Sequence, residues 1–134
     1  MRIYKFGGAS VKDSKGIENL FSILNNKGFD NTLLVVSAMG KTTNAFELVV
    51  KNYFENKSEL QYSINEIFKF HNQILIDLFS NQNHEIYKDV QFIFESLKGF
   101  LSRNKSPNYS FVYDQVVPNG ELLSTKIISA YLNF

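Results

Sequence analysis

The sequence contains no cysteine, and this absence excludes disulfide bonds and any catalysis that needs a thiolate. A chain without cysteine is typical of a reducing compartment, so we expect a cytoplasmic protein. Histidine is also scarce, with two residues in the whole chain, and a histidine-rich metal site is therefore not expected.

Strong net charge and long apolar runs are missing as well. The formal net charge is +1, which gives no electrostatic reason to expect a nucleic-acid or anionic-membrane partner. The sequence has neither the pattern of a signal peptide nor an apolar run long enough for a transmembrane helix. We therefore predict no nucleic-acid partner and no membrane partner.

The residues that are present suit a small globular domain. Hydrophobic residues make up 44% of the 134 residues, which is ordinary for a folded protein. The length is enough for one small domain and too short for two. Many of the 13 phenylalanines and 7 tyrosines recur at helical spacing, which indicates core packing and, in part, a surface for partner structure.

The first 37 residues predict a strand, a helix and a second strand. Residues 2–6 are predicted to form a short strand, and residues 14–27 carry one apolar helical face before Gly28. Residues 32–37 are almost continuously apolar, which is typical of a strand buried on both faces of a parallel sheet. This order predicts a right-handed βαβ unit, and hence an α/β fold.

A mostly helical pattern follows from residue 43 to about residue 102. Polar, turn-like residues interrupt it near 56–58 and 80–83. The apolar segment 111–117 is compatible with a strand or a helix. Residues 118–120 predict a break, after which a final amphipathic helix is expected at 121–131.

A lysine and two glycines stand together where the first predicted strand ends. Lys5 lies at the end of this strand, and Gly7 and Gly8 follow it closely. Glycines let backbone N–H groups approach an anion without a Cβ in the way, and a lysine can neutralise a transferring phosphoryl group. The spacing is neither that of a P-loop nor that of a dinucleotide fingerprint. We interpret the segment as a phosphate site; the alternative is a solvated lysine at a strand edge.

Hydroxyl groups follow the second predicted strand. Ser37 ends that strand, and Thr43 lies where the next helix is expected to begin, with Thr43 or Asn44 as its cap. Ligands of open α/β sheets bind at such junctions, so Ser37 and Thr43 are candidate contacts for a carboxylate. The alternative is that these side chains serve only the backbone, and for Thr42 or Asn44 alone we favour that alternative.

Glu121 lies in the first turn of the final predicted helix. The helix dipole favours a carboxylate there, and this stabilisation alone would account for the residue. The functional interpretation is that Glu121 binds a substrate ammonium group, with Ser124 one turn further on.

These three segments resemble the aspartokinase family, in the family's order. Residues 5–11 resemble the signature K-F-G-G-T-S-V, with Ala9 where threonine is common. Residues 35–44 resemble the second motif, in which a strand ends in V-S-A and continues to T-N. Residues 120–124 resemble the G-E-x-x-S helix start, and the helical stretch before them resembles the insertion of one aspartokinase type.

The resemblance implies the N-terminal portion of a three-layer amino-acid kinase fold of the carbamate kinase type. On this basis residues 1–55 are expected to form the βαβ core with the phosphate and substrate loops. Residues 56–106 would form a helical insertion, and residues 107–134 the connection and the substrate-site helix. The implied activity is phosphorylation of the side-chain carboxylate of L-aspartate by ATP, accompanied by Mg²⁺, which gives 4-phospho-L-aspartate for lysine, threonine and methionine synthesis.

The resemblance also implies roles for single residues. Lys5 would stabilise the transferring phosphoryl group, and the remaining nucleotide contacts would come from Phe6, Gly7, Gly8 and Ser10. Aspartate would be held by Ser37, Thr43 and Glu121, with Glu121 on the amino group.

In the family the catalytic domain continues well beyond 134 residues and supplies most of the nucleotide pocket. We therefore expect this chain to be a fragment with little or no kinase activity alone, and to self-associate through apolar surface left uncovered. A related amino-acid kinase with another substrate is a less favoured alternative. A stand-alone, non-catalytic protein that binds an amino acid or associates with a kinase is the alternative from another functional class.

Overall fold

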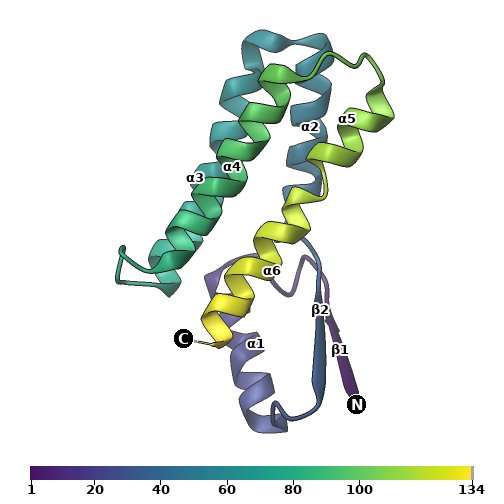
Figure 1. The fold of residues 1–134 in the computed structure, drawn as a ribbon. Coiled ribbons are helices and arrows are strands. Elements are labelled where there is room, and N and C mark those ends of the chain that lie inside the picture. Colours follow the sequence, from purple (N-terminus) through teal and green to yellow (C-terminus); the bar gives the residue numbers. More distant parts are fainter. Residues whose placement is uncertain (134) are drawn as a thin grey trace.

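The computed structural model describes residues 1–133, which form a mixed α/β chain with a small sheet and many helices. Its elements, in order, are β1 (Arg2–Phe6), α1 (Ser14–Lys27), β2 (Thr32–Val36), α2 (Thr42–Glu55), the 3₁₀ turn η1 (Lys57–Glu59), α3 (Leu60–Leu78), α4 (Glu85–Arg103), α5 (Tyr109–Val116) and α6 (Asn119–Leu132). Figure 1 shows the sheet and α1 at one end, with the longer helices extending away from them.

The first three elements form the predicted βαβ unit. β1 and β2 pair in parallel, with Arg2 opposite Thr32 and Phe6 opposite Val36. Asp13 begins α1, because its Oδ1 accepts a hydrogen bond from the Gly16 N–H at 2.8 Å. Gly28 ends the helix with φ +89°, a backbone conformation that favours glycine.

The sheet is covered on one face only. The covered face packs on the core through Tyr4, Phe6, Leu34 and Val36. On the other face Ile3, Leu33 and Val35 are 64%, 49% and 44% exposed. The prediction that β2 is buried on both faces is therefore wrong for the described residues, because they supply no second layer. The expected uncovered apolar surface, in contrast, is present.

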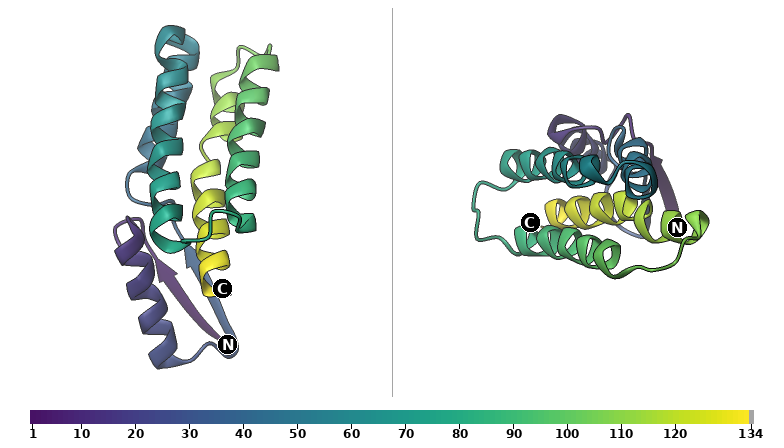
Figure 2. Two further views of the ribbon diagram at one scale, coloured as in Figure 1. Left: turned by 90° about the vertical axis from the view of Figure 1, so that its left-hand side faces the viewer. Right: turned by 90° about the horizontal axis from the view of Figure 1, so that it is seen from above.

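The longer helices pack as two pairs. α2 lies along α3, and α4 lies along α6; the view from above in Figure 2 shows the two pairs side by side. Each helix turns an apolar face toward the other pair, as the sequence periodicity predicted. α6 runs back toward the sheet, so that its end approaches α1 and β2 (Figure 1).

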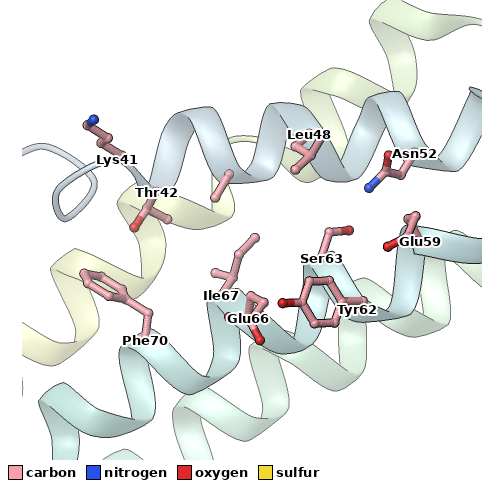
Figure 3. A pocket seen from close by; sticks show the side chains of 11 residues that line it. Lys41, Thr42, Leu48, Asn52, Glu59, Tyr62, Ser63, Glu66, Ile67 and Phe70 are labelled. Carbon is pink, nitrogen blue, oxygen red and sulfur yellow. The ribbon is translucent and has the colours of Figure 1, made fainter. Parts of the chain in front are cut away.

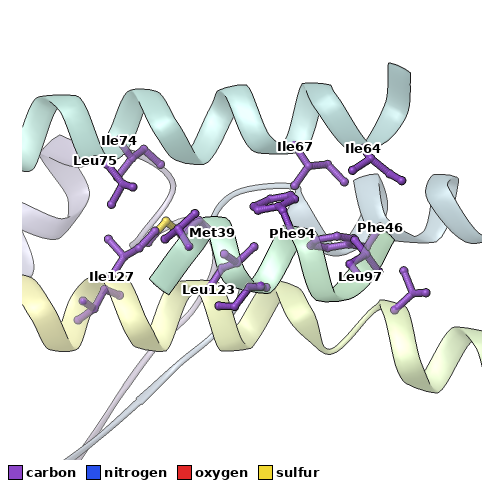
Figure 4. Packing of buried hydrophobic residues seen from close by; sticks show 14 of the residues in the cluster. Met39, Phe46, Ile64, Ile67, Ile74, Leu75, Phe94, Leu97, Leu123 and Ile127 are labelled. Atoms are coloured by element: carbon purple, nitrogen blue, oxygen red, sulfur yellow. The ribbon is translucent and has the colours of Figure 1, made fainter. Parts of the chain in front are cut away.

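The apolar core of this bundle includes the loop after β2. Met39 of that loop is completely buried, as are Phe46 of α2 and Leu123 and Ile127 of α6. Figure 4 shows Met39 between Leu75 and Leu123, in the middle of the packed side chains. Burying a side chain of this size contributes about 1.5–3 kcal/mol. The bundle therefore anchors the loop that carries the second sequence motif.

The structure decides between strand and helix for the segment 111–117, which the sequence left open. Residues 111–117 belong mostly to a helix, α5, which starts at Tyr109. Asn108 caps it by accepting a hydrogen bond from the Phe111 N–H at 3.0 Å. α6 begins at Asn119, inside the predicted break, so that a single short turn separates the two helices. The predicted interruptions near 56–58 and 80–83 are confirmed.

Within the described part of the chain, no helix combines the length and the apolar character needed to cross a bilayer.

His71 of α3 is completely buried in the bundle. Its Nδ1–H donates to the Ile67 carbonyl at 2.8 Å, and Nε2 has no hydrogen-bond partner among the described residues. Burial lowers the pKa of His71 to about 4, against a smaller raising effect of the bond to Ile67. The folded state therefore holds this ring in its neutral form.

We expect a pH-dependent stability from this burial. Unfolded His71 titrates near 6.5, so stability is fully present above that pH and falls as the pH drops toward 4, by about 3 kcal/mol in total. Urea unfolding at a series of pH values between 4 and 7 measures this slope. His71→Leu cannot be protonated and should flatten it; an equal slope in both proteins would contradict the prediction.

Candidate active site

The candidate site lies where the loops after β1 and β2 meet the first turns of α2 and α6. The ladder of the sheet continues into these loops, because the Ser37 N–H donates to the Phe6 carbonyl at 3.0 Å. The first and second motifs then contact each other directly, because the Gly40 N–H donates a hydrogen bond to the Gly8 carbonyl at 3.1 Å.

The two loops approach so closely that Gly8 leaves no room for a side chain. A Cβ at this position would lie 2.9 Å from the Gly40 carbonyl oxygen and 3.0 Å from that of Ala38. Gly40 itself has φ +55°, in the left-handed region. Both glycines are therefore required for geometry, which explains their place in the two motifs.

Gly7, in contrast to Gly8, has open space where a side chain would lie. It is exposed, and a Cβ there would meet no atom within 4 Å. Its carbonyl accepts hydrogen bonds from the N–H groups of Ser10 and Val11, which closes the loop into a tight turn. The space beside Gly7 is open to an approaching ligand.

The third motif packs against the second. A Cβ on Gly120 of α6 would lie 3.1 Å from the Ala38 Cβ and 3.2 Å from the Thr42 Cγ2. Thr42 is the first residue of α2, so the amino-terminal turns of α2 and α6 are neighbours. Each helix N-terminus carries partial positive charge, and their meeting creates an environment that favours an anion.

The structure places the candidate substrate residues around this junction. Ser37 is half-buried at the end of β2, and Thr43 and Glu121 are exposed in the first turns of α2 and α6. Thr43 and Glu121 directly follow Thr42 and Gly120, the two residues in contact. No hydrogen bond or ion pair joins the side chains of the three candidates in the described residues.

The prediction that Thr43 or Asn44 caps α2 is wrong. The N-cap is Lys41, and no side chain makes a capping hydrogen bond there. Thr42 takes the buried position instead, and its hydroxyl donates to the Met39 carbonyl at 2.6 Å. Thr42 thus serves the backbone, as predicted, and Thr43 is left with a free exposed hydroxyl.

Lys5 lies on the uncovered face of the sheet. It is exposed, shares that face with Ile3 and pairs with Val35 in the register of the sheet. It makes no ion pair in the part of the chain that the structure describes. Lys5 therefore presents an exposed side chain on the uncovered face, two residues before Gly7.

Phe6 and Ser10 line a small hollow between the first loop and α1. Its volume is about 240 Å³, and Ala9 and Asn19 also contribute to it. The five residues assigned to the nucleotide therefore lie in or next to one loop, but Lys5 and Phe6 are on opposite faces of the sheet. Within residues 1–133, no three carboxylate or imidazole groups gather as a metal site.

Sequence reasoning missed the packing role of one glycine in this region and the burial of Ser124, which it had named beside Glu121. The role of Gly120 as a close-packing position was not seen, although its place directly before Glu121 was a signal. Ser124 is completely buried, and its Oγ has no hydrogen-bond partner among the described residues. No pattern in the sequence distinguishes such a hydroxyl from an ordinary helical serine.

We expect Gly8→Ala to destabilise the protein and Gly7→Ala to be tolerated. The new methyl group at position 8 would push against two carbonyl oxygens, which should lower the free energy of unfolding by about 1–3 kcal/mol. The methyl group at position 7 meets open space. Urea unfolding of both variants checks this, and equal stabilities would contradict the packing of the two loops.

Comparison with known proteins gives relatives of one kind. Chloroplastic aspartokinase 2 of Arabidopsis thaliana is 30% identical over 135 residues, which cover 98% of this chain and 24% of that protein. The chloroplastic bifunctional aspartokinase/homoserine dehydrogenase 2 of Arabidopsis thaliana is 26% identical, over 95% of this chain and 14% of its own length. A chloroplastic bifunctional aspartokinase/homoserine dehydrogenase 1 of Zea mays is 27% identical over the same shares.

No protein-family model matches the chain. The chain spans less than a quarter of the length of the curated relatives that it matches. The similarity nevertheless extends over nearly the whole chain, and it supports an aspartokinase-related origin.

Proposed function

We propose that this chain is the N-terminal part of the catalytic amino-acid kinase domain of an aspartokinase. The reaction would be transfer of the γ-phosphoryl group of ATP to the side-chain carboxylate of L-aspartate. The observation that carries the proposal is the junction of three motifs: Gly8 contacts Gly40, and Gly120 contacts Ala38 and Thr42. The distant similarity to aspartokinases supports the same proposal.

The first loop would hold the phosphates. The open space at Gly7 admits an anion to the backbone, while Gly8 keeps the loop pressed on its neighbour. Phe6 and Ser10 would complete this contact from the hollow beside α1. Lys5 would neutralise the charge that spreads over the phosphoryl group during an in-line transfer.

The second and third motifs would hold aspartate. The hydroxyls of Ser37 and Thr43 can donate to a carboxylate, and the adjoining helix N-termini favour the same charge. Glu121 would bind the substrate ammonium group. These contacts would act by positioning the acceptor carboxylate for attack.

Mg²⁺ would reach the site with the phosphates of ATP. Mg²⁺ usually keeps several waters and needs only one or two protein carboxylates beside the substrate phosphates.

The test is a titration of the isotope-labelled chain with MgATP, followed through its amide resonances. We expect the largest shifts at Gly7, Gly8 and Ser10. Lys5→Ala should weaken binding about tenfold or more, since a hydrogen bond to a charged group is worth about 1.5–3 kcal/mol. Lys51→Ala removes an exposed lysine of α2, outside the loops, and is the matched control.

Shifts confined to other parts of the chain, or equal effects of the two lysine variants, would contradict the phosphate assignment. A parallel titration with L-aspartate distinguishes the proposed aspartokinase from the two alternative functions. Aspartate binding at residues other than Ser37, Thr43 and Glu121 would favour a non-catalytic amino-acid-binding protein, and a preference for L-glutamate would favour a related amino-acid kinase.

A further inference from the structure

The turn between α5 and α6 leads into the one asparagine of the sequence that is followed by a glycine, Asn119 before Gly120. In such a pair the backbone nitrogen of the glycine can attack the side-chain carbonyl carbon of the asparagine, because the glycine has no Cβ to hinder the approach. The proposed kinase chemistry uses neither the Asn119 side chain nor this reactivity.

The native fold holds both reacting groups in hydrogen bonds. The Asn119 Nδ2 donates to the carbonyls of Gln115 and Val116, at 3.1 Å and 2.9 Å. The Gly120 N–H donates to the Val117 carbonyl at 3.1 Å. Asn119 is also the first residue of α6, whereas ring closure needs a non-helical backbone at the asparagine. The turn must therefore open before the two groups can react.

Hydrolysis of the Asn119 amide would break the contacts that join the two helices. A carboxylate at this position has no N–H to donate, so its oxygens would repel the carbonyl oxygens of Gln115 and Val116. These carbonyls lie at the carboxyl end of α5, where the helix dipole disfavours a negative charge. The product therefore loses two hydrogen bonds and gains an unfavourable charge.

The isoaspartate form of the product would also lengthen the main chain by one methylene group directly before Gly120. Gly120 has little room to move, because a Cβ on it would lie 3.1 Å from the Ala38 Cβ and 3.2 Å from the Thr42 Cγ2. Figure 3 shows Thr42 at the first turn of α2, beside the pale yellow ribbon of α6. A longer main chain would displace the third motif from the second.

We propose that Asn119 is a site of spontaneous deamidation that requires opening of the turn between α5 and α6. In the open turn the Gly120 nitrogen forms a bond to the Asn119 Cγ. The bond from Cγ to Nδ2 breaks, and ammonia leaves with the proton of the Gly120 nitrogen. Water, the only co-reactant, then opens the succinimide ring at either carbonyl carbon and gives aspartate or isoaspartate. Each modified chain loses the packing of Gly120 on the second motif.

The proposal is tested by incubating the full chain at neutral pH, both native and unfolded in guanidinium chloride. Chromatography and mass spectrometry of a digest measure aspartate and isoaspartate at position 119. The native chain should react about tenfold more slowly or less, because two side-chain hydrogen bonds must break before the ring can close. The factor of this slowing should match the hydrogen-exchange protection of the Gly120 amide, since the same opening frees that nitrogen.

Three variants separate opening of the turn from other causes. Val116→Ala shortens a completely buried side chain at the end of α5 and should speed deamidation and Gly120 exchange by the same factor. The matched control, Val90→Ala, makes the same change at a buried position of α4 and should leave both rates unchanged. Asn119→Gln keeps the amide on a longer side chain that cannot close the five-membered ring, and it should give no product.

The deamidated chain carries one additional negative charge, so ion exchange separates it from the unmodified chain. Its amide resonances should shift at Ala38 and Thr42, the neighbours of Gly120. The proposal would be overturned by an unfolded chain without product at position 119, by equal rates in native and unfolded chains, or by a native rate that does not follow Gly120 exchange. Unchanged resonances at Ala38 and Thr42 would also overturn it. All of these measurements are made without nucleotide or aspartate, so their outcome is independent of the proposed function.

Discussion

The close approach of Gly8 to Gly40 is the contact on which the rest of the candidate site depends. The parallel ladder of β1 and β2 brings two loops to the same edge of the sheet, and the bond from the Gly40 N–H to the Gly8 carbonyl fixes their separation. Any side chain at Gly8 would separate the loops. A site assembled in this way is held by backbone rather than by side chains, which suits a site that binds phosphate through N–H groups.

The helical bundle holds this arrangement from the other side. Met39 anchors the second loop in the core, and Gly120 lets α6 pack directly on Ala38 and Thr42. The position of Glu121 therefore depends on packing more than one hundred residues along the chain from Gly8. The helices serve the site by placing two helix N-termini against the loops of the sheet, while their outer surfaces remain available for other contacts.

Much of this organisation could be predicted from the sequence, because local patterns determine it. Apolar periodicity predicted α1, α2, α3 and α4, and the order of glycines and hydroxyls placed the motifs at element ends. Patterns failed where long-range packing decides: the sequence of β2 indicates two covering layers, and the described chain supplies one. Segment 111–117 was too short for its apolar periodicity to distinguish a strand from a helix. No local pattern encodes how α2 and α3 pack together.

Native-state hydrogen exchange at the amide of Gly40 tests the central claim most directly. The account predicts that this amide is protected through the same opening as the amide of Ser37, which continues the sheet ladder by its bond to Phe6. Similar opening free energies for the two amides would show that the loops are held together as one unit. A Gly40 amide that exchanges at the rate of an unprotected loop, beside a protected Ser37, would contradict the account.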